Sequence, residues 1–146
     1  MNVLLKGLLL VALVLLVSTE AQQPYESWDS KYKIHVDKAL EKVNTGNLGV
    51  NHANFHLIQE PLRISDNYYI VNIILRSTKC KKERGNHGHR KECEPVNRHF
   101  FDCVVCKTND GELVHCATLR DVLKAKPAER EKCLSKKEQE GAQNLF

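Results

Sequence analysis

Cysteine is absent from the first 79 residues of this 146-residue chain, so no disulfide can form within that half. The N-terminal half must therefore fold by burying apolar surface. The chain also has no Asn-x-Ser/Thr sequon, so N-glycosylation is not expected. After residue 21 no segment is apolar enough to span a membrane, which takes about 20 predominantly apolar residues.

Catalytic motifs are missing as well. The sequence has no nucleophile elbow, no phosphate-binding glycine loop and no HExxH pair. Candidate bases stand at His99, His115 and Asp102, but seven histidines scattered at strand spacing are more typical of surface or core positions. We therefore expect that the protein is not an enzyme.

Residues 1–21 have the features of a secretory leader. Lys6 provides a positive charge, residues 8–17 are an unbroken apolar run, and Thr19 and Ala21 are small residues suited to the −3 and −1 positions of a cleavage site. The apolar run is short for a membrane anchor, so the pattern favours a cleaved signal peptide and a secreted, extracellular protein.

The six cysteines all follow residue 79. An even number of cysteines in a small exported protein predicts a disulfide framework, because the oxidising compartment keeps thiols paired. We expect one domain over residues 22–133 with three disulfides, and a flexible C-terminal tail over residues 134–146, which lack periodicity. The cysteines are Cys80, Cys93, Cys103, Cys106, Cys116 and Cys133.

Hydrophobic periodicity predicts one helix followed by four strands. Trp28 to Val43 carries an apolar stripe at helical spacing, and Asp29 or Ser30 is the expected N-cap. From residue 51 the period changes to two, which indicates an α+β domain whose antiparallel sheet wraps around the helix. The expected strands run from residue 51 to Pro61, over 68–77, over 99–107 and over 112–119, with a hairpin turn at 109–111.

The segment between Cys80 and Cys93 is polar throughout, and it predicts a surface loop that buries nothing. Six basic against two acidic residues give positions 79–93 a net charge of +4, equal to that of the whole chain. Such a patch attracts sulfated glycans, anionic membrane surfaces or an acidic receptor, although a loop that is only solvated is the alternative. The basic residues are Lys79, Lys81, Lys82, Arg84, Arg90 and Lys91.

Three other interpretations of these residues are disfavoured. Cys80, Cys93 and two histidines have the ligand types of a zinc site, but the oxidising compartment argues for a disulfide, so no metal or other cofactor is expected. The CxxC at 103–106 contains two valines typical of a strand, whereas redox CxxC pairs open a helix. Nucleic-acid binding is not expected, because no aromatic residues interleave with the basic loop.

A leader, a helix and antiparallel strands with late disulfides resemble the cystatin/cathelicidin superfamily. Within it, the spacing of the cysteines is similar to the chemerin branch: a basic loop lies between Cys80 and Cys93, Cys103 and Cys106 form a CxxC, and Cys116 ends an LVHC stretch. The resemblance covers residues 30–134. It implies a cystatin-like fold and the bridges Cys80–Cys93, Cys103–Cys116 and Cys106–Cys133.

One observation agrees with that pairing. Cys103 and Cys106 are three apart on a predicted strand, so their side chains point to opposite faces and should take different partners.

The resemblance also implies a function. Chemerin-type proteins are chemoattractant or adipokine-type ligands of a G-protein-coupled receptor, and proteolysis of an aromatic-rich tail activates them. The tail of this chain ends in Leu145 and Phe146, which are its only apolar anchor for a receptor. We expect a monomer whose partners are a cell-surface receptor and a processing protease.

Two alternatives stay open. A cathelicidin-like antimicrobial protein would use the basic loop against anionic membranes. An extracellular protease inhibitor would use the two hairpins, but the links at 60–67 and 107–111 match neither the QxVxG nor the PW motif of inhibitory cystatins.

Overall fold

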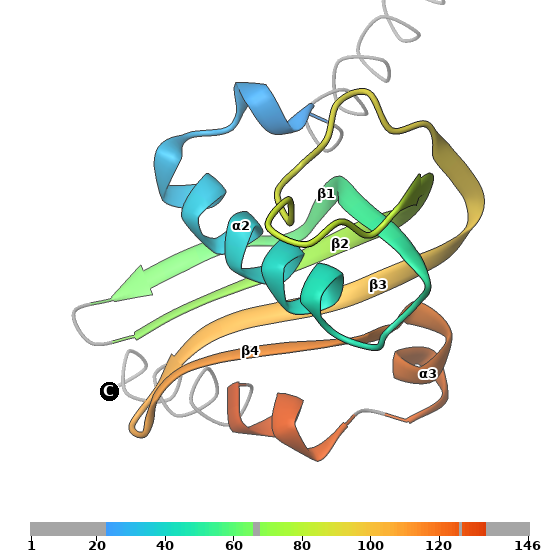
Figure 1. The fold of residues 1–146 in the computed structure, drawn as a ribbon. Helices are drawn as coiled ribbons and strands as arrows, with labels where there is room; N and C mark the ends of the chain where they lie inside the picture. The colour runs from blue at the N-terminus through green and yellow to red at the C-terminus, as the bar shows by residue number, and fades with distance from the viewer. Residues whose placement is uncertain (1–22, 66–67, 126, 134–146) are drawn as a thin grey trace, which may run out of the picture.

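The computed structural model describes residues 23–65, 68–125 and 127–133 (Figure 1). A short 3-10 helix, η1, precedes the long helix α2, and four strands form one antiparallel sheet in the order β1-β2-β3-β4. The elements are η1 (Tyr25–Ser27), α2 (Ser30–Thr45), β1 (Asn51–Ser65), β2 (Tyr68–Lys81), β3 (Pro95–Thr108), β4 (Gly111–Thr118) and α3 (Leu119–Lys124), and residues 128–133 are also helical.

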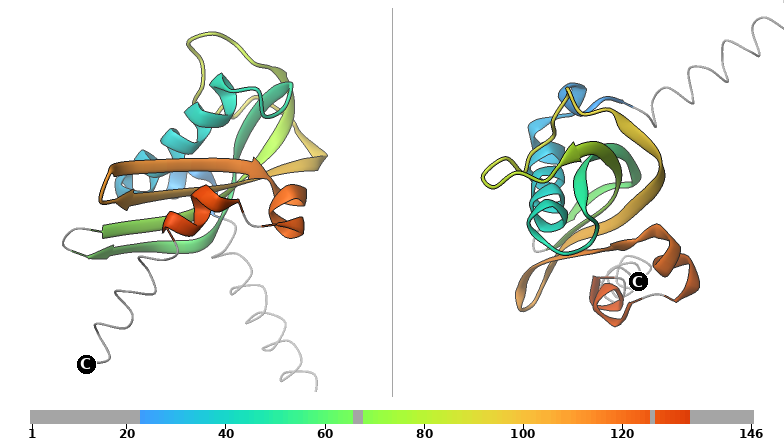
Figure 2. Two further views of the ribbon diagram at one scale, coloured as in Figure 1. Left: turned by 90° about the horizontal axis from the view of Figure 1, so that it is seen from below. Right: turned by 45° about the vertical axis from the view of Figure 1, so that its right-hand side comes forward.

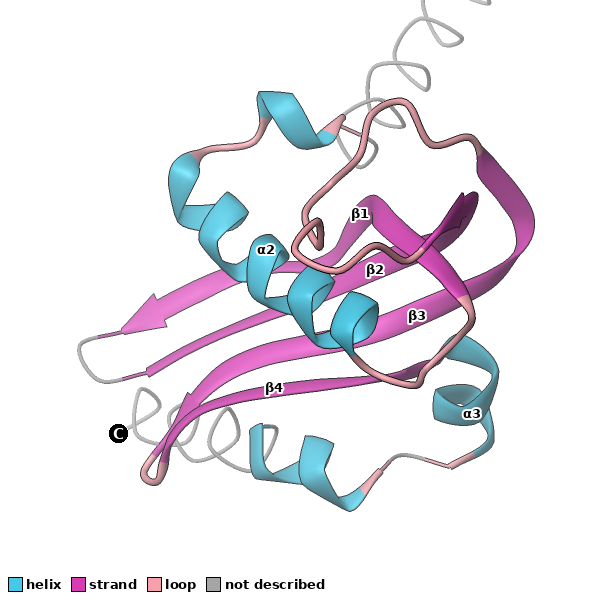
Figure 3. Cartoon of the chain, in the orientation of Figure 1, coloured by secondary structure: helices cyan, strands magenta, loops and turns pink. Residues whose placement is uncertain are grey.

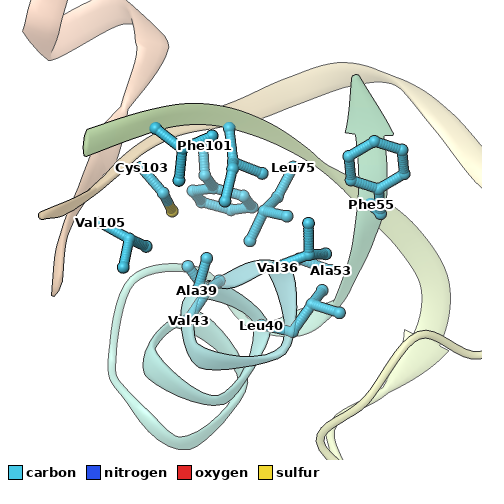
Figure 4. Packing of buried hydrophobic residues seen from close by; sticks show 12 residues of the cluster. Val36, Ala39, Leu40, Val43, Ala53, Phe55, Leu75, Phe101, Cys103 and Val105 are labelled. Atoms are coloured by element: carbon cyan, nitrogen blue, oxygen red, sulfur yellow. The ribbon is translucent and has the colours of Figure 1, made fainter. Parts of the chain in front are cut away.

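Helix α2 packs across one face of the sheet, as the periodicity predicts. Its apolar stripe, Val36, Ala39, Leu40 and Val43, is completely buried against residues from β1, β2 and β3 (Figure 4). The predicted α+β architecture, with one helix on a four-stranded antiparallel sheet and three disulfides, is confirmed. The helix begins at Ser30, and the Asp29 side chain makes no capping hydrogen bond.

The expected end of the first strand at Pro61 is wrong, since β1 continues to Ser65. Pro61 lies where the pairing with β2 shifts register, between Glu60 and Arg63. Because β1 is an edge strand, a proline there need not remove a ladder hydrogen bond. The third strand also begins earlier than expected, at Pro95.

Strand β3 contains a bulge near its start. Arg76 of β2 pairs with Phe100, whereas Thr78 pairs with Pro95, so β3 has three more residues than its partner between these two points. His99 lies in this bulge with φ of 74°, a left-handed conformation that few residues other than glycine adopt. The Arg76 side chain holds the bulge by donating to the carbonyl of Val96 at 2.6 Å.

The sheet face opposite α2 is covered too. Side chains of β2 and β3 form a second buried cluster with Cys133, and Figure 2 shows α2 and residues 128–133 on opposite sides of the sheet. Arg130 and Asp102 form an ion pair there, and their side chains are only 6% and 10% exposed. The short helices that follow β4 were not predicted from the sequence. The cluster comprises Tyr68, Ile70, Val104, Cys106 and Cys133.

Two of the residues with positive φ, Gly49 and His99, should respond in opposite ways to substitution. Gly49 has φ of +112°, and an added Cβ would lie 2.9 Å from the ring of Phe101. We expect Gly49→Ala to lower the free energy of unfolding by about 1–3 kcal/mol. His99→Gly relieves strain and should leave that free energy unchanged or raise it by up to about 1 kcal/mol. Urea denaturation measures both; a stabilised Gly49→Ala protein would contradict the close approach of Phe101 to this backbone.

The buried ion pair generates a second prediction. Arg130→Met leaves the Asp102 carboxylate buried without its cation, and should cost about 3–5 kcal/mol of unfolding free energy. Adding Asp102→Leu should recover most of this loss, because the uncompensated charge is removed. Equal losses in the single and double variants, measured by urea denaturation, would show that Arg130 contributes packing alone.

Candidate binding surface in the loop between β2 and β3

The loop between β2 and β3 is closed by a disulfide at its base. Cys80 and Cys93 are bonded, with their Cα atoms 5.6 Å apart. The other bonds join Cys103 to Cys116 and Cys106 to Cys133, and no described cysteine is free. This is the pairing that the resemblance implied.

The expectation that this loop buries nothing is wrong, because polar side chains of α2 and β1 hold its backbone. The amide of Asn44 donates to the carbonyls of Ala53 and His87, at 3.0 and 2.8 Å. Asn54 makes a reciprocal pair with Arg90, accepting from its N–H at 2.8 Å and donating to its carbonyl at 2.7 Å. Both asparagines are buried, so these bonds are shielded from water.

Two histidines complete the attachment. The fully buried His52 bonds the carbonyl of Gly88 through Nε2 at 2.9 Å, and His89 Nδ1 accepts from the Phe55 N–H at 3.2 Å. The ring of Tyr25, from η1, stacks on His89 at 4.8 Å. Burial lowers the pKa of both histidines, which favours their neutral forms. Figure 3 shows the resulting course of the loop over α2 and β1.

Three of the six predicted basic residues are engaged within the fold. Arg90 is half-buried and pairs with Glu92 at 3.1 Å and Glu83 at 3.4 Å. Lys82 donates to the carbonyls of Gly46 and Gly49, and burial lowers the pKa of its ammonium group. Lys79 pairs with Glu94 at 3.2 Å. Their charges are therefore partly used inside the protein.

The other three basic residues, Lys81, Arg84 and Lys91, project into solvent. All three are exposed, and no hydrogen bond or ion pair joins their side chains to any residue in the described part of the chain. The acidic residues of the loop are instead occupied by Arg90 and Lys79. The structure thus presents three free cations on a backbone that is fixed by a disulfide and by buried hydrogen bonds.

The structure also locates the residues that could have formed a zinc site, a redox pair or a catalytic site. Cys80 and Cys93 share a disulfide, so neither supplies a thiolate to a metal. Cys103 and Cys106 lie on a strand and bond to different partners. Of the catalytic candidates, Asp102 is paired with buried Arg130, His115 Nε2 lies 3.8 Å from a carboxylate oxygen of Glu129, and His99 lies exposed in the β3 bulge.

The remaining predicted sites lie at chain ends or turns. Leu145 and Phe146, the predicted receptor-binding tail, are outside the described residues, as is the predicted leader. The two hairpins between β1 and β2 and between β3 and β4 lie at the same end of the sheet, away from the β2–β3 loop (Figure 1). Within the described residues, no helix is long and apolar enough to cross a membrane.

Comparison with known proteins identifies a relative. The chain is 37% identical to a protein named "Cystatin-like protein" from Clarias batrachus, over 137 residues. The alignment covers 91% of this chain and 82% of the relative. No family model matches the sequence, and no solved structure matches it.

Removing the Asn54 side chain should release the loop between β2 and β3 without unfolding the protein. Asn54→Ala leaves the Arg90 N–H and carbonyl unpaired, which we expect to cost about 1–3 kcal/mol. Because local opening becomes more frequent, trypsin should cleave after Arg84 and Lys91 about tenfold faster or more. Limited proteolysis followed by mass spectrometry measures these rates.

A matched control is available for that experiment. Asn47 is exposed and its side chain makes no described contact, so Asn47→Ala should leave the cleavage rates unchanged. Unchanged cleavage in Asn54→Ala would show that the Asn54 side chain does not hold the loop in place.

Proposed function

The chain belongs to the cystatin-like proteins, a non-enzymatic family, and from that membership and the presented cations we propose a secreted signalling ligand of the chemerin type. In this proposal the protein acts by binding. The loop cations Lys81, Arg84 and Lys91 hold it on sulfated glycans of the cell surface. The C-terminal tail, with Leu145 and Phe146, contacts a G-protein-coupled receptor after processing by a protease.

The observation that carries the proposal is the state of the basic loop. Clustering like charges on a fixed backbone costs electrostatic energy, which a loop needed only for solubility would avoid by remaining mobile. The fold instead fixes this backbone through Asn44, His52 and Asn54. A fixed array loses less conformational entropy on binding a polyanion than a mobile loop would.

The alternatives differ in which segment they need. An antimicrobial protein acting through the basic loop would keep its activity without the tail. A protease inhibitor would act through the two hairpins, at the end of the sheet away from the loop. Those hairpins lack the inhibitory motifs, so inhibition is the less favoured of the two.

Glycan binding can be tested with a charge-matched pair of variants. We expect replacement of Lys81, Arg84 and Lys91 by glutamine to weaken heparin binding about tenfold, because three exposed contacts of modest energy are lost. The control replaces Lys31, Arg63 and Lys107, which are exposed elsewhere, and removes the same charge. Equal weakening in both proteins would mean that net charge alone drives retention.

Receptor activation requires its own measurement. Deleting Leu145 and Phe146 should change receptor signalling and cell migration without altering thermal stability, because these residues follow the last cysteine and its disulfide. The loop variant should signal normally in solution but lose activity on immobilised heparin. Identical signalling by the full-length and shortened proteins would remove the chemoattractant proposal and leave host defence ahead.

A further inference from the structure

A cavity of about 820 Å³ lies at the end of the sheet away from the hairpins. It is formed where the α2–β1 connection, the bulged start of β3 and helix α3 come together (Figure 1). None of the three free loop cations lines it. Its volume falls in the usual range for sites that bind small molecules.

The walls of this cavity are apolar. Phe101 is buried at its base, while Val50 and Leu123 are 90% and 79% exposed at its sides. Large aliphatic side chains this exposed are stabilised when an apolar ligand covers them. Phe100 and Leu119 extend the same surface.

The rim of the cavity is cationic. Arg98 and Arg120 line it from β3 and α3, no acidic side chain is among its lining residues, and neither arginine has a hydrogen bond or ion pair with any residue that the structure describes. Lys82 lies close by, bonded to the carbonyl of Gly49, another lining residue. The charge around the cavity therefore favours an anion.

The local backbone is shaped to form this site. The β3 bulge places Arg98 and His99 on the rim, and it keeps His99 in a strained left-handed conformation. Arg76 fixes the bulge and lies over the ring of Phe100 at 5.4 Å. Strain that neighbouring side chains hold in place is typical of binding sites.

From the apolar walls and the two arginines on the rim, we propose that this cavity binds a medium-chain fatty acid. The hydrocarbon chain lies along Phe101, Val50 and Leu123, and the carboxylate accepts hydrogen bonds from Arg98 and Arg120. Guanidinium groups suit a carboxylate because their N–H groups match its two oxygens. A neutral or cationic head group would leave the arginines without an anion.

The test uses calorimetric titration of the full secreted chain with decanoate and dodecanoate below their micelle concentrations. One molecule should bind per chain, and each added methylene should tighten binding by up to about fourfold. Replacing Arg98 and Arg120 by glutamine should weaken binding about tenfold. Decanol should bind the original protein no better than decanoate binds this double variant.

Substitution of the walls has a matched control. Leu123→Asp places a carboxylate on an exposed apolar wall residue and should weaken decanoate binding more than tenfold. Ile64→Asp makes the same change at another exposed aliphatic residue, in the hairpin region of β1, and should leave it unchanged. Amide chemical-shift changes on titration should concentrate at residues 49–51, 98–101 and 118–123.

Several results would overturn the proposal. These are equal decanoate affinity in the original protein and the arginine variant, or shifts located outside the cavity. Binding to anionic vesicles without binding of monomeric decanoate would indicate a membrane-contact surface instead. If removal of residues 140–146 tightened binding more than tenfold, the chain's own terminus would be the occupant. The variant in which Lys81, Arg84 and Lys91 are replaced by glutamine should bind decanoate normally. A failure of this proposal can therefore be distinguished from a failure of the proposed function.

Discussion

The two disulfides of β3 leave the strand from opposite faces, and both layers of the protein depend on this arrangement. Cys103 points to the α2 side and bonds to Cys116 of β4, whereas Cys106 points to the other side and bonds to Cys133. A spacing of three residues on a strand produces this opposition. One strand therefore anchors the main core on one face and the C-terminal segment on the other.

The third disulfide has a different role, because it only closes the base of the β2–β3 loop. What fixes the rest of that loop is a set of buried polar side chains, chiefly Asn44, His52 and Asn54. These residues satisfy the loop's backbone groups, which water would otherwise have to solvate. The loop cations are thus presented by the same contacts that cover the beginning of β1.

Much of the fold could be predicted from the sequence because its apolar periodicity is strong. The stripe of α2 identifies the buried face of the helix, and the apolar residues on both faces of β2 indicate that both sides of the sheet are covered. The extension of β1 past Pro61 could not be predicted, since it depends on β1 being an edge strand. The start of β3 could not be predicted either, because a bulge held by Arg76 interrupts the alternation of apolar and polar residues along the strand.

The candidate sites were predictable only in part. Charge counting located the basic loop, but it could not separate Lys82 and Arg90, which the fold uses, from the free cations. The sequence did contain a signal for the side chains that hold the loop backbone, since His52 and Asn54 alternate with apolar residues on one strand. The sequence contains no signal for the cavity, because the cavity forms only when tertiary packing brings the six-residue helix α3 against the β3 bulge.

The anchoring of β3 on both faces of the sheet is tested most directly by peptide mapping of the protein without reduction. We expect fragments linked through Cys103–Cys116 and Cys106–Cys133, with Cys80–Cys93 as the third bond and no free thiol. A Cys103–Cys106 bond would contradict the anchoring, because both side chains would then have to reach the same face of the sheet. An exchange of partners between these two cysteines would also contradict it, because each side chain would then have to reach the face opposite to the one on which it lies.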